Sequence, residues 1–301
     1  MVMSAAAVEK SDDDTMMICA SCGIAGGDDI KLKDCSACHL VRYCSVMCQK
    51  DHWPKHKKEC KKRAAELKDE ILFKQPESTH LGDCPICCFP LPLDTTRTTT
   101  ILMSCCGKII CNGCHYTNRR YTNRRLQPKC PFCRKAVPDT EEWNERLLKR
   151  IEVNDPVAMC HMGTKSFHEG DCKTAFEYFT KSAALGNVRA HYRLGNLYRD
   201  GEGVEKDEKR AVLHFEEAAI AGHPIARHNL GCMERKNDRM DRAAKHWIIA
   251  AKLGFHASLG NVKSAYKDGH VSKEDFAAAL RGHHAAIVAT KSPQRQEAEQ
   301  N

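Results

Sequence analysis

The sequence predicts two kinds of structure in one chain: small, metal-stabilised α+β domains in the first half and an all-α solenoid of helical repeats in the second. Sixteen of the 19 cysteines lie before residue 134, mostly as Cys-x2-Cys pairs, and only 6% of all residues are aromatic. From residue 139 onward the pairs disappear, and small and aromatic residues recur at the spacing of an α-helix. We therefore expect bound ions to stabilise the first half and helix packing to stabilise the second.

Paired cysteines form disulfides or bind metal ions, and the compartment decides between the two. Residues 1–17 lack the apolar core of a signal peptide, carry three successive aspartates, and are expected to form a disordered leader. No apolar run approaches the roughly 18 residues of a membrane span. We therefore expect an intracellular protein, cytoplasmic or nuclear, with no membrane attachment and with reduced cysteines that bind metal.

The formal net charge of +8 invites a nucleic-acid partner. A zinc ion bound by four thiolates leaves a net charge of −2, and one bound by three thiolates and a neutral histidine leaves −1. Three sites of the first kind and one of the second would lower the +8 to about +1. The apparent basicity thus argues little for nucleic acid, which stays the weakest of three hypotheses.

The first cluster, residues 18–60, offers four pairs of ligands. A Cys-x2-Cys turn presents two thiolates to one ion, and an i, i+4 pair does the same from one face of a helix. A structural zinc ion takes four such ligands in a tetrahedron, so eight ligands make two sites. The eight are Cys19, Cys22, Cys35, Cys38, Cys44, Cys48, His56 and Cys60.

His39 and His52 compete with His56 for the one histidine position. Proline is favoured in the first turn of a helix, so we expect a short helix to begin at Pro54. That helix would carry His56 and Cys60 on one face and leave His52 outside it. His56 is therefore the expected ligand.

The stretch from Tyr43 to Cys60, YCSVMCQKDHWPKHKKEC, resembles the MYND finger family, and the resemblance covers about 42 residues with all eight ligand positions. It implies that the pairs interleave, with Cys19, Cys22, Cys44 and Cys48 on one ion and Cys35, Cys38, His56 and Cys60 on the other. It also implies a groove for proline-rich peptides, lined by Gln49 and Trp53. An aromatic ring suits a stiff proline segment. The alternative is that Trp53 only packs over the zinc-binding turns.

The second cluster, residues 81–138, contains Cys84-Pro-Ile-Cys87, Cys106-Gly-Lys-Ile-Ile-Cys111-Asn-Gly-Cys114 and Cys130-Pro-Phe-Cys133-Arg134. These stretches resemble the RING finger family, except that Lys108 replaces the usual histidine ligand. Cys105 would supply the missing eighth ligand, although two adjacent cysteines on one ion are a strained arrangement. Cys88 and His115 are the spare candidates for this position. The resemblance then implies one site at Cys84, Cys87, Cys111 and Cys114 and another at Cys105, Cys106, Cys130 and Cys133. In total the chain would hold about four zinc ions.

The same resemblance implies a ubiquitin ligase that holds a charged ubiquitin-conjugating enzyme in a reactive pose. Three residue types serve this purpose in the family, and they correspond to Ile86, Pro131 and Arg134. The contribution would be positioning and electrostatic help, without a covalent intermediate. In the alternative interpretation, Ile86 and Pro131 only shape the turns.

The second half repeats every 32 to 36 residues. Gly186, Gly222 and Gly254 each close a segment with a large aromatic seven positions earlier, at Phe179, Phe215 and Trp247. An upstream helix carries Gly163, Gly195 and Gly231 at equivalent positions. This is the pattern of a helix-turn-helix solenoid with glycine caps. The stretch from Leu194 to Asp207 resembles the Sel-1-like repeat, a relative of the tetratricopeptide repeat, which implies a surface for partner proteins.

The expected order is therefore two zinc fingers, at 18–60 and 81–138, joined by a helical linker at 61–80, then a repeat array at 139–290 and a disordered tail at 291–301. The sequence shows no nucleotide loop, activated nucleophile or open catalytic metal site. The leading hypothesis is a RING-type ubiquitin ligase, or an adaptor associated with one, whose MYND finger and repeats recruit partners. The alternative is a non-enzymatic scaffold that binds proline-rich peptides.

Overall fold

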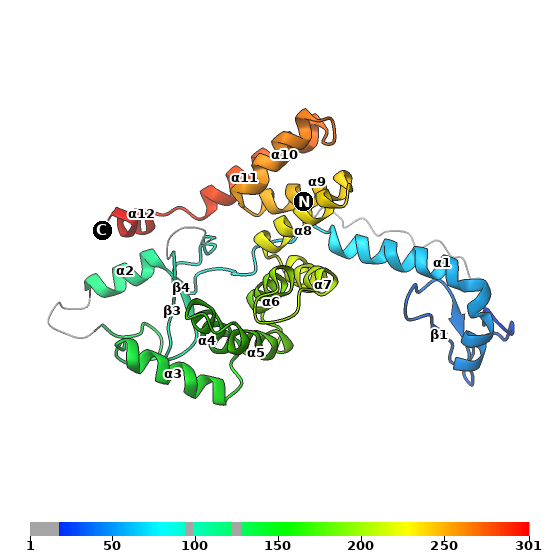
Figure 1. Ribbon diagram of the computed structural model, residues 1–301, viewed down its shortest axis with the longest axis horizontal. Coiled ribbons are helices and arrows are strands. Elements are labelled where there is room, and N and C mark those ends of the chain that lie inside the picture. The colour runs from blue at the N-terminus through cyan, green and yellow to red at the C-terminus, as the bar shows by residue number, and fades with distance from the viewer. Residues whose placement is uncertain (1–17, 94–98, 122–127, 301) are drawn as a thin grey trace, which may run out of the picture. The chain divides into compact units, whose positions relative to one another are not determined.

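The computed structural model describes residues 18–93, 99–121 and 128–300. The chain divides into two compact units, one that ends at Ile71 and one that begins at Leu72. Figure 1 shows a region of short strands at the start of the described chain and a succession of helices after it. The expected leader, residues 1–17, lies outside the described residues.

The first unit is built around thiols rather than apolar side chains. Two short strands, β1 (Lys33–Asp34) and β2 (Arg42–Tyr43), pair antiparallel, and helix α1 (Val46–Leu72) follows. Its buried cluster consists of Cys19, Cys35, Cys38, Tyr43 and Cys60. Four sulfur atoms and one ring bury too little apolar area for a domain of this size, so bound ions must supply most of its stability.

Helix α1 differs from the sequence-based expectation at its start. It begins at Val46 and continues through Pro54, so that His52 lies on the same helix as His56 and Cys60. The prediction that a new helix begins at Pro54 was wrong. Proline leaves one carbonyl of the preceding turn without its helical partner. Because Pro54 is exposed, water can satisfy that carbonyl and the helix continues.

The second cluster forms a hairpin and a helix between cysteine turns. Strands β3 (Thr100–Leu102) and β4 (Ile109–Cys111) pair antiparallel, and α2 (Asn112–Tyr121) follows directly. Single bridges, Asp83 to Pro90 and Lys129 to Ala136, close the turns at either end. Leu91, Met103 and Ile110 supply a small apolar core among the cysteines.

The second half is helical throughout, as expected, and consecutive helices pack in pairs (Figure 1). The helices are α3 (Thr140–Glu152), α4 (Pro156–His168), α5 (Cys172–Ala184), α6 (Val188–Asp200), α7 (Glu208–Ile220), α8 (Pro224–Lys236), α9 (Met240–Lys252), α10 (His256–Lys267) and α11 (Lys273–Ala289). Asp155, Asp171, Asn187 and Asp207 cap the starts of α4 to α7, since each side chain accepts a hydrogen bond from a first-turn N–H. Gly201, at φ 78°, ends α6 in the left-handed conformation.

The end of the chain also differs from the expectation of a disordered tail. Residues 293–300 form a further helix, α12 (Pro293–Gln300), which packs against α2. An isolated polar helix of this length is unstable in water. Packing on α2, a contact between segments far apart in the sequence, therefore stabilises it. None of the helices within the described ranges has the length and apolar character that a membrane span requires.

Candidate metal centres

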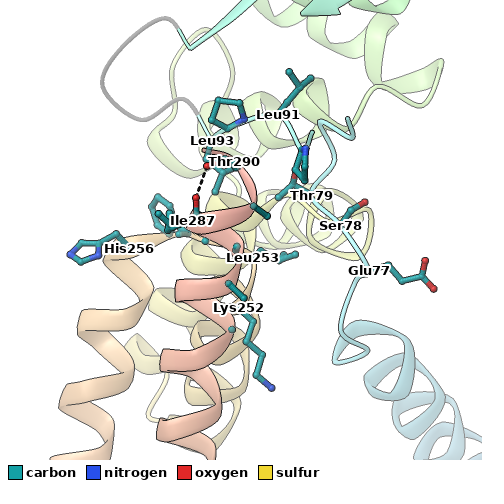
Figure 2. Close-up of a pocket in the computed structure, with 18 of the residues that line it drawn as sticks. Glu77, Ser78, Thr79, Leu91, Leu93, Lys252, Leu253, His256, Ile287 and Thr290 are labelled. Carbon is teal, nitrogen blue, oxygen red and sulfur yellow. Dashed lines mark hydrogen bonds between the residues drawn. The ribbon is translucent and has the colours of Figure 1, made fainter. Parts of the chain in front are cut away.

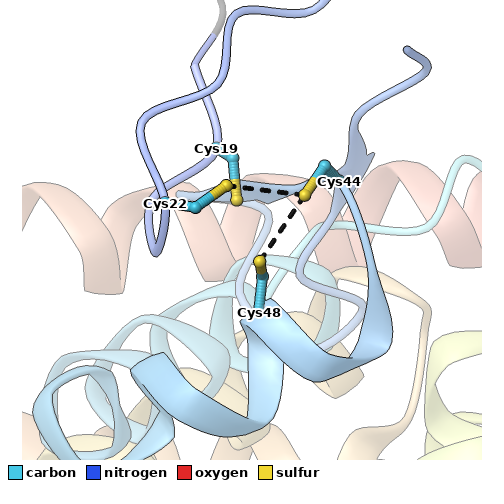
Figure 3. A group of neighbouring side chains, drawn as sticks. All are labelled: Cys19, Cys22, Cys44 and Cys48. Carbon is cyan, nitrogen blue, oxygen red and sulfur yellow. Dashed lines mark hydrogen bonds between the residues drawn. The ribbon is translucent and has the colours of Figure 1, made fainter.

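The structure gathers the sixteen predicted ligands into four groups of four, and within each group the ligand atoms lie within 4.8 Å of one another. The groups are Cys19, Cys22, Cys44 and Cys48; Cys35, Cys38, His56 and Cys60; Cys84, Cys87, Cys111 and Cys114; and Cys105, Cys106, Cys130 and Cys133. In each cluster the pairs alternate between two sites along the chain, so every site ties together segments that are separated in sequence. Figure 3 shows the first group, with four sulfur atoms that point toward a common centre.

The sulfur–sulfur distances in the first cluster fit metal binding and exclude disulfides. Cys44 Sγ lies 3.6 Å from Cys22 Sγ and 3.5 Å from Cys48 Sγ, and Cys35 Sγ lies 3.7 Å from Cys60 Sγ. A disulfide would hold the two atoms about 2.05 Å apart. With bonds of about 2.3 Å to zinc, tetrahedral neighbours lie about 3.8 Å apart. All 19 cysteines of the chain are free of disulfides.

The second cluster shows the same distances. The Sγ atoms of Cys87 and Cys111 lie 3.8 Å apart at one site. At the other, the distance is 3.7 Å between Cys106 and Cys130 and 3.3 Å between Cys105 and Cys133. Both adjacent cysteines therefore reach the same group, while Cys88 and His115 belong to none of the four groups within the described chain.

His56 occupies the histidine position in the structure. It is buried, and its Nε2 lies 3.3 Å from Cys38 Sγ. His52 stacks on the His56 ring with centroids 5.7 Å apart, and its Nδ1 lies 3.1 Å from the Tyr43 hydroxyl oxygen. The two residues support the ligand ring from outside the site. His39 lies instead at a left-handed position in the turn after Cys38, with φ 55°.

A turn with one geometry recurs at both clusters. The N–H of the first cysteine donates across the turn, from Cys19 to the Ile24 carbonyl at 2.8 Å in the first cluster. In the second cluster it donates from Cys84 to the Phe89 carbonyl at 2.9 Å and from Cys130 to the Lys135 carbonyl at 2.8 Å. The residue after the second cysteine has a positive φ, and Arg134, at 63°, holds this position in the last turn. The turn therefore fixes both thiols and directs backbone N–H groups toward the first of them.

The same turn explains how Cys105 and Cys106 share a site. Met103 takes the place of the first cysteine: its N–H donates to the Lys108 carbonyl at 2.8 Å, and its own carbonyl accepts from Gly107 N at 2.7 Å. Cys106 then stands at the second-cysteine position and Cys105 directly before it. Lys108 Nζ lies 4.5 Å from the centroid of the Phe132 ring, in a cation–π contact rather than in the ligand group.

The thiols of each group differ in acidity. Burial opposes ionisation of Cys19 and Cys35, but hydrogen bonds from backbone N–H groups lower the pKa of each to about 6. The same balance lowers the pKa of Cys84 and of Cys130 to about 7. In contrast, hydrogen bonds with the neighbouring thiols Cys48 and Cys22 raise the pKa of Cys44 to about 12. Each group therefore has one thiol ready to bind, and metal binding must displace protons from others.

The donor sets fit zinc. Three groups offer four thiols and one offers three thiols with an imidazole, at tetrahedral spacing and with no position left for a substrate. Closed sites of this kind are structural rather than catalytic. The chain therefore binds zinc, with about four ions at the four groups.

The predicted partner-binding residues lie on the surfaces of the two clusters. On α1, Trp53 is 39% exposed and Gln49 is half-buried one turn earlier, so both lie on one helix face. In the second cluster, Ile86 is 42% exposed and lies in the turn of one site. The half-buried Pro131 and the exposed Arg134 lie at the last turn, which belongs to the other site.

A cavity of about 700 Å³ lies elsewhere in the second unit. Its walls come mainly from residues 77–79, 90–93, 252–257, 285–287 and 289–290, and Figure 2 shows Leu91, Leu93, Leu253 and Ile287 among them. The lining is mainly apolar, and none of the four ligand groups contributes to it. The zinc groups remain the centres to which the sequence and the structure both point.

Comparison with known proteins identifies two of the domain types. The MYND finger model matches residues 19–60, and the Sel1 repeat model matches residues 156–187, 188–223 and 224–255. The chain therefore contains a MYND finger and three Sel1 repeats. Both are protein-interaction domains, so this is a zinc-binding protein-interaction protein.

Similarity to whole proteins is limited to parts of their length. DAP3-binding cell death enhancer 1 of Mus musculus is 31% identical over 54% of this chain and 39% of its own length. Histone-lysine N-methyltransferase SMYD3 of Homo sapiens is 58% identical over 10% of this chain and 7% of its own length. A Sel1 repeat protein of Oxalobacter formigenes has a solved structure with a TM-score of 0.43 and 21% identity, over 56% of this chain and 52% of that one. The chain thus spans well under half of these curated relatives.

Proposed function

We propose that this protein is a RING-type ubiquitin ligase, or an adaptor associated with one, whose MYND finger and Sel1 repeats recruit partners. The observation that supports it most is the second cluster, in which two interleaved four-cysteine groups present Ile86 and Arg134 at their turns. In this proposal residues 18–60, 81–138 and 139–290 are separate functional domains. Because thiol ligands must stay reduced, we also propose an intracellular site of action, in the cytoplasm or the nucleus.

The exposure of these two side chains favours an interaction surface. Ile86 is a large apolar residue that is 42% exposed to solvent. Among the described residues, the Arg134 guanidinium has no hydrogen-bond or ion-pair partner. A conjugating enzyme would cover Ile86 by apolar contact, and Arg134 would donate hydrogen bonds to ubiquitin and the enzyme. Positioning of this kind accelerates transfer without a nucleophile on the ligase.

A discharge assay tests the proposal. Zinc-loaded protein is added to conjugating enzymes charged with ubiquitin, over a panel of such enzymes, and the loss of the thioester and the appearance of self-ubiquitinated product are measured. We expect discharge that Arg134→Ala lowers at least tenfold while bound zinc stays unchanged. Lys135→Ala, at the adjacent exposed position, is the matched control. A fully metallated protein that discharges no enzyme of the panel would contradict ligase activity.

The second candidate function is a non-enzymatic scaffold for proline-rich peptides, and the observation that favours it is the surface of α1. Trp53 is part-exposed one helical turn from Gln49, which combines an apolar platform with an amide that can bond to a peptide carbonyl. We expect Trp53→Ala to abolish measurable binding of proline-rich peptides in calorimetry. Met47→Ala, at a more exposed apolar position on the same helix, should leave it unchanged. Peptide binding that survives Trp53→Ala would exclude this groove.

A further inference from the structure

Helix α12, which begins at residue 293, lies against α2, which ends at residue 121, and Figure 1 shows the two helices as neighbours. The contact is close at Gly113, which stands between the ligands Cys111 and Cys114. A Cβ added to Gly113 would come within 2.8 Å of Arg295 N and within 2.9 Å of Arg295 Cγ. Farther along α2, Arg120 forms an ion pair with Glu297. The start of α12 therefore meets the first turn of α2, which carries the ligand Cys114 and directly follows the ligand Cys111 of β4.

The Arg295 side chain reaches the metal centre itself. It is only 6% exposed, and its Nη1 donates to the carbonyls of Pro90 and Thr290, each at 2.7 Å. Its Nη2 donates to Cys87 Sγ at 3.4 Å and to the Phe89 carbonyl at 3.2 Å. The guanidinium thus joins the end of the repeat array, the turn after Cys87 and one zinc ligand.

Opposite charges make the contact between Arg295 and the zinc site favourable. A buried cation is costly unless an opposite charge lies beside it, and the acceptors of Arg295 in these four bonds are three neutral carbonyls and a thiol. Four thiolates around one zinc ion leave a net charge of −2, which is also costly to bury. Placing the guanidinium against Cys87 offsets both costs. A charge-assisted bond to the sulfur also holds the ligand in place.

We propose that Arg295 is an outer-sphere partner of the zinc ion at Cys84, Cys87, Cys111 and Cys114, so that helix α12 forms part of this metal centre. Zinc retention at this one site then depends on α12. The proposal does not depend on ubiquitin transfer, and its test measures only metal.

Zinc release to an excess of a coloured chelator tests the proposal on the full-length, zinc-loaded protein. Loss of an outer-sphere partner usually weakens metal affinity about 10- to 100-fold. For Arg295→Met we therefore expect one ion of the four sites to leave faster by up to about this factor, while the others keep their rates. Arg281→Met, at an exposed position of α11, is the matched control and should release zinc as the parent chain does. Release curves of Arg295→Met that superimpose on those of the parent chain would overturn the proposal.

Two further variants test the proposal independently of whether Arg295→Met folds correctly. Gly113→Ala should displace α12 by the steric contact alone and accelerate release of the same ion. In a chain that ends at Lys291, where α12 is absent, that ion should already leave rapidly and Gly113→Ala should add no further acceleration. An equal acceleration by Gly113→Ala in both chains would contradict the proposal, because the effect would then come from the ligand turn itself. Cadmium-substituted protein, observed by 113Cd NMR, should show a single perturbed four-sulfur signal in all of these variants.

Discussion

Gly195 lies so close to the ring of Phe215 that a Cβ on the glycine would come within 2.5 Å of ring carbons Cδ1 and Cε1. The relationship repeats along the array. A Cβ added to Gly163 would lie 2.8 Å from Phe179 Cε1, and one added to Gly231 would lie 2.5 Å from Trp247 Nε1. In each repeat the first helix therefore carries a glycine where the large aromatic of the second helix rests on its backbone. The regular spacing of these residues in the sequence reflects this contact.

The first prediction concerns the glycine–aromatic contact. Gly195→Ala should destabilise the repeat array by about 1–3 kcal/mol, because the fully buried Phe215 has little room to move away from the new methyl group. Urea unfolding followed by far-UV circular dichroism measures the change.

Gly260→Ala is the matched control, since it lies on α10 and a Cβ there would meet nothing within 4 Å. It should stabilise its helix by up to about 1 kcal/mol. If the two variants shifted the unfolding midpoint in the same direction, the contact with Phe215 would not be the reason for the glycine.

The second prediction concerns the metal dependence of the first unit. His56→Gln should lower bound zinc by about one ion and unfold the residues around β1 and β2, because the buried cluster there is almost entirely thiol. The helices of the repeat array should keep their circular dichroism. Atomic absorption on purified protein gives the ion count.

His52→Gln provides the comparison, because His52 stacks on His56 but belongs to none of the four described ligand groups. It should retain the full zinc complement with weaker affinity. A loss of one ion from His52→Gln, with none lost from His56→Gln, would reverse the assignment of the ligand.

The third prediction concerns the adjacent cysteines. Cys105→Ser should remove about one zinc ion, because the Cys105 sulfur lies 3.3 Å from that of Cys133 within the ligand group. Cys88→Ser should remove none, since Cys88 is exposed and follows the turn without joining a group among the described residues. Equal zinc contents of the two variants would show that Cys105 is dispensable.

The fourth prediction concerns pH. His246 is fully buried, both of its ring nitrogens lack a hydrogen-bond partner among the described residues, and its ring lies 4.7 Å from that of Phe73. Burial, with Arg227 and Arg242 nearby, lowers its pKa from 6.5 to about 3. The unfolded chain therefore binds a proton below pH 6.5 that the folded chain does not accept until about pH 3. The contribution to stability is complete above pH 6.5 and falls as the pH falls, by about 2 kcal/mol at pH 5.

His246→Leu should remove that part of the pH dependence. The stability of the variant relative to that of the parent chain should therefore rise as the pH falls from 7.5 to 5. His168→Gln, on the exposed surface, controls for the loss of a histidine as such. Comparing unfolding midpoints between chains at each pH cancels the acid release of zinc that all of them share. An unchanged difference between His246→Leu and the parent chain at the two pH values would refute the burial argument.

The sequence by itself determined the local geometry of this protein. Cys-x2-Cys spacing places two thiols on one turn, and an interval of four residues places His56 and Cys60 on one helix face. The same logic identified the repeat unit from its glycines and aromatics. These features depend on residues that are neighbours along the chain, so their spacing encodes their arrangement.

The tertiary structure alone decided what depends on distant contacts. Arg295 and Cys87 are 208 residues apart, and no sequence pattern in either segment predicts their hydrogen bond. Residues 293–300 read as a polar tail because α12 gains its stability from α2, not from its own residues. Likewise Met103 shows its role only in the fold, where it takes a cysteine's place in a turn and lets Cys105 and Cys106 share one site. Spacing records short-range geometry, whereas the free energy of a packed or charged contact belongs to two segments that only folding brings together.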